Sequence, residues 1–140
     1  MLASITATRL GISNEPTSKE IENNIIRCAQ FLQELRDKIN KSIRVFSCYR
    51  SPKVNKAVGG SKTSAHMQGL AVDFEVTGMS NKELAEYIRD NFTDYDQIIL
   101  EFPPGGWVHV GIATETSNRK QNLTAKKKNG KTVYSSGFKE

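Results

Sequence analysis

Two predicted strands in this 140-residue chain each carry a polar side chain on the face opposite their apolar residues. In LAVDFEV (70–76) the apolar residues alternate around Asp73, and in WVHVGI (107–112) two valines flank His109. Because residues two apart on a strand point to the same face, Asp73 and His109 are both expected to point away from the apolar core. If the strands are neighbours, these side chains meet. His66, the other of the chain's two histidines, could reach them from the preceding loop.

Two imidazoles and one carboxylate form a set of three protein ligands that zinc accepts. With a fourth position open to water, such a set is typical of a catalytic rather than a structural zinc site. The bound ion would lower the pKa of its water to about 7 and would polarise a carbonyl group. The residue types alone leave a second interpretation open, in which histidine and aspartate form only a hydrogen-bonded structural pair.

The remaining sequence predicts the elements that must position these residues. Helices are expected at 18–39 and 81–92, strands at 44–49, 70–76, 97–102 and 107–112, an edge strand at 131–136, and loops at 50–64 and 114–130. Thr17 with Glu20, and Ser80 with Glu83, predict capping boxes at the two helix starts. This order indicates a single α+β domain over the whole chain, 1–140. We expect a mainly antiparallel sheet with helices packed on one side and the zinc site on the other face.

The net charge of +5 is concentrated at the C-terminal end. Residues 109–140 contain seven lysines and arginines against two glutamates, so the preceding residues are neutral overall. This basic segment, about 114–140, indicates either a solvated loop or a surface that attracts a polyanion such as nucleic acid, teichoic acid or an anionic membrane. No apolar stretch approaches the roughly 20 residues that span a bilayer. The first residues lack the pattern of a signal peptide, which predicts synthesis in the cytoplasm.

The chain has two cysteines, Cys28 in a predicted helix and Cys48 in a predicted strand. They lack the mutual spacing of a metal site. In a cytosolic product they are expected to be buried free thiols that pack as small apolar residues. Nothing in the sequence supports a disulfide between them.

Three sequence elements resemble those of a known family. Residues 64–73 match the pattern S-x-H-x-x-G-x-A-x-D, residues 107–109 match the W-x-H element that follows it, and YRSP at 49–52 matches an element that many members carry. Together they resemble the zinc D-alanyl-D-alanine carboxypeptidase family, which includes the L-alanyl-D-glutamate endopeptidases of phage lysins. The resemblance runs from Ser47 to Ile112, just under half of the chain. Three elements in the family's order are more specific than any one alone.

By this resemblance His66, Asp73 and His109 are the zinc ligands. Arg50 would bind the polarised carbonyl oxygen or a substrate carboxylate, since its charge is permanent and its planar fork donates two hydrogen bonds. A surface ion pair is the alternative for Arg50. Ser64 would hold a substrate carboxylate or His66 itself, and its alternative is a hydrogen bond to loop backbone.

One position departs from the family pattern. Much of the family has an acidic residue three positions before the last histidine, where this chain has Gly106, which cannot transfer a proton. The nearest upstream acid, Glu101, is therefore predicted as the general base, with a cross-strand ion pair as its alternative. Pairing Glu101 with Trp107 in a hairpin keeps both apolar faces together and puts Glu101 on the side of His109. Trp107 would form either a wall of the substrate cleft or part of the packing.

The resemblance implies a zinc metallopeptidase that hydrolyses an amide bond in peptidoglycan stem peptides, as a D,D-carboxypeptidase or an endopeptidase. A chain without a signal peptide fits a phage lysin that acts on the cell wall after release, where the basic segment could bind an anionic wall polymer. A second hypothesis, favoured by Gly106, is a non-catalytic zinc module that binds wall peptides or assembles a phage particle. A third is a domain whose lysine cluster binds nucleic acid. The order of the three elements argues against it.

Overall fold

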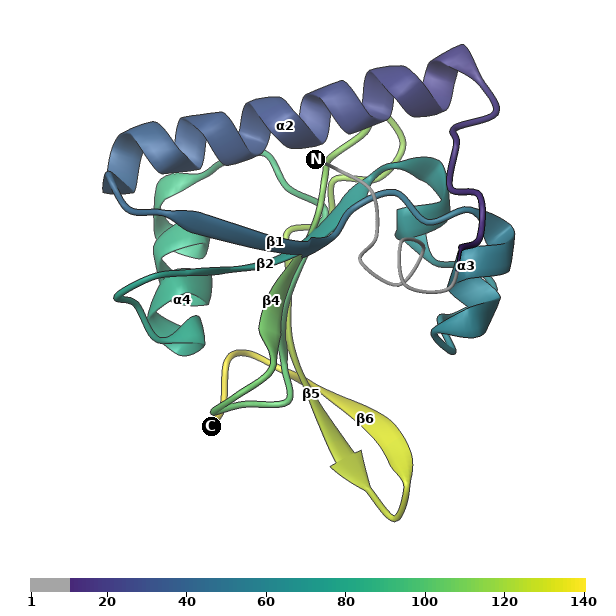
Figure 1. Cartoon of the computed structure of the whole chain (residues 1–140). Helices are drawn as coiled ribbons and strands as arrows, with labels where there is room; N and C mark the ends of the chain where they lie inside the picture. The colour runs from purple at the N-terminus through teal and green to yellow at the C-terminus, as the bar shows by residue number, and fades with distance from the viewer. Residues whose placement is uncertain (1–10) are drawn as a thin grey trace.

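The computed structural model describes residues 11–140, and the first ten residues, on which the expected absence of a signal peptide depends, lie outside this range. The elements are α2 (Lys19–Ile39), β1 (Ile43–Ser47), α3 (Pro52–Ala57), the 3-10 turn η1 (Ala65–Gln68), β2 (Ala71–Val76), α4 (Asn81–Asn91), β3 (Gln97–Glu101), β4 (Trp107–Gly111), β5 (Gln121–Lys128) and β6 (Lys131–Ser136) (Figure 1). Within the described part of the chain, no helix is both long and apolar enough to cross a membrane.

The six strands form one sheet in the order β1-β2-β4-β3-β5-β6. β3 and β5 run parallel, and the other four pairings are antiparallel. The predicted α+β class is confirmed, but the sheet is mixed, where a mainly antiparallel one was expected. β4 ends beside the start of β3, where Gly111 pairs with Gln97. β5 begins at the same end on the other side of β3, where Gln121 pairs with Gln97, and it therefore runs parallel to β3.

The apolar core lies between one face of the sheet and the helices α2 and α4. Phe31 of α2 packs against Phe74 of β2, with ring centroids 6.4 Å apart. The remaining core residues on the two helices and three central strands are Cys28, Leu32, Leu35, Leu84, Ala85, Ile88, Val72, Val76, Ile98, Leu100, Val108 and Val110. Burial of each large apolar side chain stabilises the fold by roughly 1.5–3 kcal/mol. Because the alternate residues of these strands point the other way, Asp73 and His109 lie on the opposite face, as predicted.

Serine residues cap both long helices. The Ser80 hydroxyl accepts a hydrogen bond from the Glu83 amide at 3.1 Å, as predicted for α4. In α2 the cap is Ser18, whose hydroxyl accepts from the Ile21 amide at 3.2 Å. The predicted cap, Thr17, was wrong by one position, because two adjacent hydroxyl residues can both serve and only the path of the chain selects between them.

The segment 50–64, predicted as a loop, contains the short helix α3. The Ser51 hydroxyl accepts a hydrogen bond from the Val54 amide at 3.3 Å. Pro52 stands at the first helical position, where its missing amide hydrogen costs nothing. The prediction was wrong because the proline was interpreted as a loop signal rather than as a helix start.

The segment 114–130, also predicted as a loop, contains the strand β5. Its sequence, QNLTAKKK, is polar and has no apolar alternation, so local sequence did not predict a strand. Its backbone is paired on both sides, with β3 and with β6. The strand therefore depends on tertiary pairing. The edge strand predicted at 131–136 is confirmed as β6.

Both cysteines are buried free thiols, as predicted. The Cys28 thiol donates a hydrogen bond to the Gly69 carbonyl oxygen at 3.2 Å. The neighbouring Cys48 thiol and burial raise the pKa of Cys28, so this thiol stays protonated and packs as a small core residue.

Candidate metal centre

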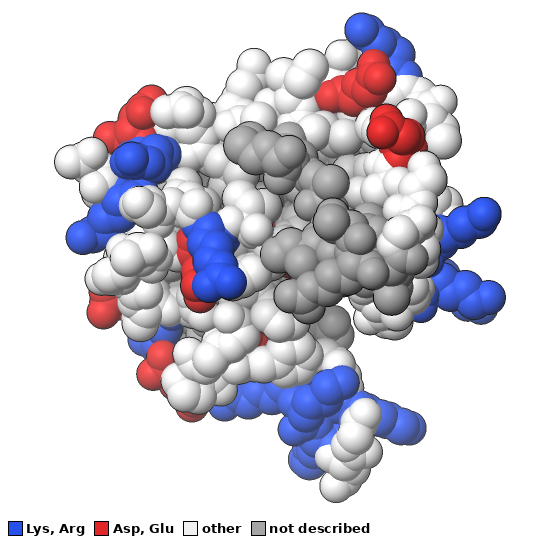
Figure 2. All heavy atoms as spheres, in the orientation of Figure 1, with Lys and Arg blue, Asp and Glu red and all other residues white. Residues whose placement is uncertain are grey.

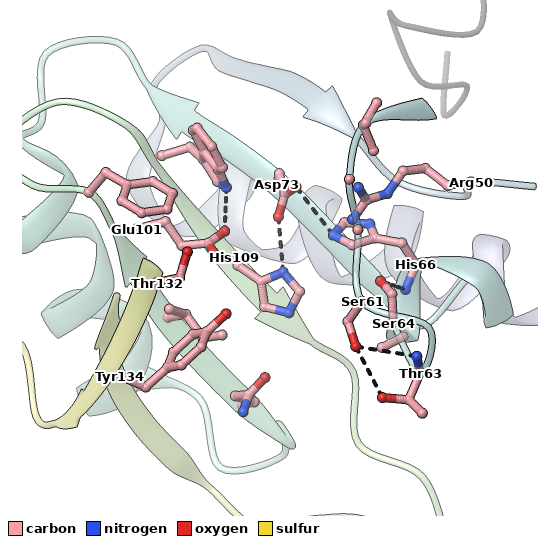
Figure 3. A pocket seen from close by; sticks show the side chains of 18 of the residues that line it. Arg50, Ser61, Thr63, Ser64, His66, Asp73, Glu101, His109, Thr132 and Tyr134 are labelled. Atoms are coloured by element: carbon pink, nitrogen blue, oxygen red, sulfur yellow. Dashed lines mark hydrogen bonds and ion pairs between the residues drawn. The ribbon is translucent and has the colours of Figure 1, made fainter. Parts of the chain in front are cut away.

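His66, Asp73 and His109 meet on the face of the sheet opposite the core helices (Figure 3). β2 and β4 are adjacent, and their register places Asp73 directly opposite His109. Asp73 Oδ1 lies 3.0 Å from His109 Nδ1, and Asp73 Oδ2 lies 3.2 Å from His66 Nε2. One ligand atom from each of the three residues lies within 4.8 Å of the other two. The convergence expected from strand alternation is therefore present.

The SAHMQG segment holds His66 above Asp73. The Ser64 hydroxyl accepts a hydrogen bond from the His66 amide at 3.2 Å, and the His66 carbonyl accepts one from the Arg50 amide at 3.0 Å. Gly69 ends η1 at a φ of 70°, a conformation that favours glycine, and a Cβ there would lie 3.0 Å from a carbonyl oxygen of α2. The local backbone thus turns directly from His66 into β2. The backbone role considered for Ser64 is present, while its predicted substrate contact stays a prediction.

The hydrogen bonds around His66 leave one ring nitrogen for a cation. His66 Nδ1 lies 2.6 Å from the Cys48 carbonyl oxygen, which only accepts, so Nδ1 carries the hydrogen and Nε2 the lone pair. Nε2 is buried, makes no hydrogen bond to any residue of 11–140 and faces the Asp73 carboxylate. Burial lowers the pKa of His66, which disfavours a second proton on the ring. The Nε2 lone pair and the Asp73 carboxylate are thus placed so that one cation could accept electron density from both, and a carbonyl-oriented imidazole is the usual form of a metal ligand.

The charge of Asp73 also suits a metal. Burial alone would raise the pKa of Asp73, but the two imidazoles beside it hold that pKa below its usual range. Asp73 is therefore ionised, as a ligand must be. Burial opposes a charge on His109, yet the hydrogen bond and charge of Asp73 outweigh burial and raise the pKa of His109. Two nitrogens and one carboxylate oxygen form a donor set that fits zinc.

Arg50 points toward this trio from the segment between β1 and α3 (Figure 3). Its Nε is buried without a hydrogen-bond partner, and Arg50 forms none of the ion pairs found among residues 11–140. Burial lowers the pKa of Arg50, while the charges of Asp73 and Glu101 act in the opposite direction. The surface ion pair considered as its alternative is therefore absent from the described residues. An unpaired guanidinium beside the trio is available to bind an oxygen of a ligand.

Glu101 lies on the same face of the sheet as His109. β3 and β4 pair so that Glu101 is opposite Trp107, the register that the apolar faces predicted. The Trp107 indole donates a hydrogen bond to Glu101 Oε2. The Phe102 ring packs edge-on against the indole, with centroids 5.6 Å apart. Burial raises the pKa of Glu101, and the charge of His109 acts against this shift. Glu101 has a hydrogen-bond partner in Trp107 rather than the cross-strand ion pair considered as its alternative.

The turn between β3 and β4 explains why this chain has glycine at position 106, where the family pattern has an acidic residue. Its φ is 66°, and a Cβ at this position would lie 1.8 Å from the Glu101 carbonyl oxygen. No side chain fits this turn without a change of the backbone. An acidic residue is therefore excluded at this position, and the neighbouring strand places Glu101 near His109 instead.

The sequence model of the family described as Peptidase M15 matches residues 1–111. The chain belongs to the M15 peptidase family. This confirms the resemblance to the zinc D-alanyl-D-alanine carboxypeptidases and makes the chain a member of a family of zinc-dependent metallopeptidases. A comparison with curated proteins finds no matching sequence.

The M15 match ends at Gly111, the last residue of β4, yet the cleft over the trio extends further. This cleft has a volume of about 510 Å³ and is lined on one side by the loop between α3 and η1. On the other side Lys127, Thr132 and Tyr134 of the β5–β6 hairpin join β3. Sequence reasoning missed these three residues. Alternation in KTVYSS indicates that Thr132 and Tyr134 share a face, but only the pairing of β5 with β3 brings that face to the cleft.

Proposed function

We propose that this M15 chain is a zinc peptidase that hydrolyses an amide bond in peptidoglycan stem peptides. One observation carries the proposal: three ligand atoms from His66, Asp73 and His109 lie within 4.8 Å of one another at a cleft. Arg50 and Glu101 line the same cleft. Membership of the M15 family supports a peptidoglycan-related substrate, and the residues of the cleft support amide hydrolysis.

In this proposal His66, Asp73 and His109 hold the zinc ion. When bound, zinc acts as a Lewis acid toward a carbonyl oxygen and lowers the pKa of water. The chain's own contribution is to orient the three donors, to keep Asp73 ionised and to disfavour a second proton on His66. The Cys48 carbonyl fixes the His66 ring at 2.6 Å, and the Asp73 carboxylate bridges the two imidazoles.

Glu101 acts as the general base and then as the general acid. Its carboxylate takes a proton from the attacking water and returns it to the amine that leaves when the amide carbon–nitrogen bond breaks. The hydrogen bond from Trp107 holds Oε2, so Oε1 remains for the proton. A pKa raised by burial suits this role, because a less acidic carboxyl accepts the first proton more readily.

Arg50 binds the substrate oxygen that becomes negative as the amide carbon turns tetrahedral, or a substrate carboxylate. Its guanidinium has no competing partner among residues 11–140, so no existing ion pair must break first. A donor aimed at developing charge in a site with little water contributes strongly to rate. Ser64 and Trp107, which also line the cleft, would contact the substrate peptide.

The second candidate function is a non-catalytic zinc module that binds wall peptides or assembles a phage particle. Gly106 is the feature that favours it, since the family's usual acid is missing there. The position of Glu101 in the cleft counters this argument. For the peptidase and for a wall-binding module alike, the site of action would be the bacterial cell wall, and the lysines of β5–β6 would bind its anionic polymers.

Digestion of purified peptidoglycan by the zinc-loaded protein, with products identified by mass spectrometry, tests the proposal. Release of free D-alanine would identify a carboxypeptidase, and cleaved stem peptides would identify an endopeptidase. Absence of any product from a preparation with one zinc per chain would contradict hydrolysis and favour the binding module.

A further inference from the structure

The β5–β6 hairpin adds a wall to the cleft that lies beyond the residues matched by the M15 family. The match covers residues 1–111, whereas β5 begins at Gln121. The hairpin extends the sheet past β3 and projects from the body of the domain (Figure 1). Its contribution to the cleft therefore belongs to this chain and does not follow from the family match.

The pairing of β3, β5 and β6 places one face of the hairpin, here called its inner face, on the side of the sheet that carries Glu101. Glu101 pairs with Ala125 of β5, and Ala125 pairs with Tyr134 of β6. Directly paired residues share a face, so Tyr134 points to the side of the sheet that carries Glu101 and His109. Two strand spacings of about 4.8 Å separate Glu101 from Tyr134, and the small buried Ala125 between them leaves room for longer side chains. Figure 3 shows Tyr134 and Thr132 beside Glu101, across the cleft from Ser64.

Lys127 lies on the same inner face as Thr132 and Tyr134. It pairs with Thr132 across the hairpin, and its Nζ donates to the Thr132 hydroxyl at 3.3 Å. The same Nζ lies 5.7 Å from the centroid of the Phe102 ring, which also lines the cleft. These contacts hold the ammonium group at the edge of the cleft.

The charge of Lys127 has no carboxylate partner among residues 11–140. Arg119, another cation lining the cleft, is paired with Asp96 at 2.8 Å. Lys126 and Lys128 alternate with Lys127 along β5 and therefore point to the opposite face. The hairpin end of the molecule is strongly basic in Figure 2, but by this alternation only one of the three consecutive lysines faces the cleft.

We propose that the β5–β6 hairpin is a specificity element that binds a carboxylate of the substrate peptide through Lys127, with the Thr132 and Tyr134 hydroxyls as hydrogen-bond partners. The inference rests on the proposed function, since it concerns the substrate of that site. Arg50 and Lys127 then lie on opposite sides of the metal-binding trio, and a peptide that spans the trio contacts both. The enzyme therefore binds peptides with a free carboxylate on the hairpin side more tightly than peptides in which that carboxylate is converted to a carboxamide.

The test uses a series of synthetic stem peptides in which each free carboxylate is converted to a carboxamide in turn. For the zinc-loaded wild type, one such change raises KM about fivefold and leaves kcat unchanged. Lys127→Met raises KM for the unmodified peptide by the same factor. The KM of this variant no longer increases when that carboxylate is converted to a carboxamide. Lys128→Met, on the opposite face of the same strand, behaves as the wild type. Tyr134→Phe weakens the preference in part.

The outcomes separate this inference from the proposed function. Equal KM values for Lys127→Met and Lys128→Met, or no response of the wild type to any amidation, overturn the role of the hairpin while hydrolysis stands. If the zinc-loaded wild type cleaves no peptide, hydrolysis fails, and calorimetry of the same peptides decides the hairpin separately. Weaker binding by Lys127→Met than by Lys128→Met then supports it, and equal binding overturns it.

Discussion

The Trp107 indole and the Glu101 carboxylate form a hydrogen-bonded pair at the edge of the cleft over His66, Asp73 and His109. The two residues are paired directly across the β3–β4 hairpin. Because an indole N–H only donates, it holds one carboxylate oxygen and leaves the other available. Apart from Asp73, Glu101 is the one acid among the described residues that line the cleft. Oε1 of Glu101 is therefore the oxygen available to take up a proton.

Glu101→Gln is expected to lower kcat for peptidoglycan hydrolysis by about 100-fold or more, because the amide cannot accept and return a proton. The amide oxygen can still accept the hydrogen bond from Trp107, so zinc content and thermal stability should match the wild type. Glu75→Gln is the matched control, since Glu75 lies two residues from Asp73 on β2 and pairs with Arg44 at 3.8 Å. Full activity of the Glu101 variant would rule out its role as the base.

Removal of a ligand is expected to abolish stoichiometric metal binding. His66→Ala should lower zinc affinity by at least about 100-fold, because only two donors remain and the Asp73 carboxylate loses one of its two imidazole partners. Zinc per chain, measured by mass spectrometry of the metal after dialysis, should fall from one to near zero. Glu75→Gln should retain one zinc. An unchanged zinc content in His66→Ala would mean that the metal, if bound, lies elsewhere.

Gly106→Ala is expected to destabilise the fold by at least about 2 kcal/mol, because the position requires a φ of 66° and the new Cβ would collide with the Glu101 carbonyl oxygen. Gly105→Ala, one residue earlier in the same turn, meets no atom within 4 Å and should change stability by less than about 0.5 kcal/mol. Urea denaturation of both variants measures the difference. Equal stability of the two variants would contradict the argument from the turn.

The Asp96–Arg119 pair predicts a pH dependence of stability. Hydrogen bonds from Arg119 lower the pKa of Asp96 from 3.8 to about 2. A lowered pKa in the folded state stabilises the fold above the ordinary pKa, and this contribution is lost as the pH falls through the folded value. Asp96→Asn should therefore reduce the free energy of unfolding by about 1 kcal/mol near neutral pH, since Arg119 is half exposed.

The same difference should shrink as the pH falls from about 4 to about 2. Chemical denaturation of wild type and Asp96→Asn at several pH values measures it. The control is Asp94→Asn, because the exposed Asp94 side chain makes no hydrogen bond among residues 11–140 and should not change stability at any pH. A difference between wild type and Asp96→Asn that stays constant down to pH 2 would show that the pair does not act through the Asp96 charge.

Alternation within single strands was enough to predict several features of the site. It put Asp73 and His109 on the face away from the core, and it selected the register that pairs Glu101 with Trp107. These predictions succeeded because a strand has a period of two and a one-residue slip would expose its apolar face. His66 was inferred from its place on the loop before the strand of Asp73, and the family elements added Arg50, because no local period indicates either residue.

Tertiary structure alone decided what surrounds that site. β5 is too polar to be predicted as a strand, and it forms because its backbone pairs with β3 and β6. Without β5, neither Lys127 nor Tyr134 can be placed at the cleft, since strand alternation gives the face of a residue but not the neighbour of that face. The sequence by itself thus determined the three residues of the candidate donor set and the strand face on which Asp73 and His109 lie. The pairing of distant strands decided which side chains join the donor set, because long-range contacts depend on the whole chain and leave no local pattern.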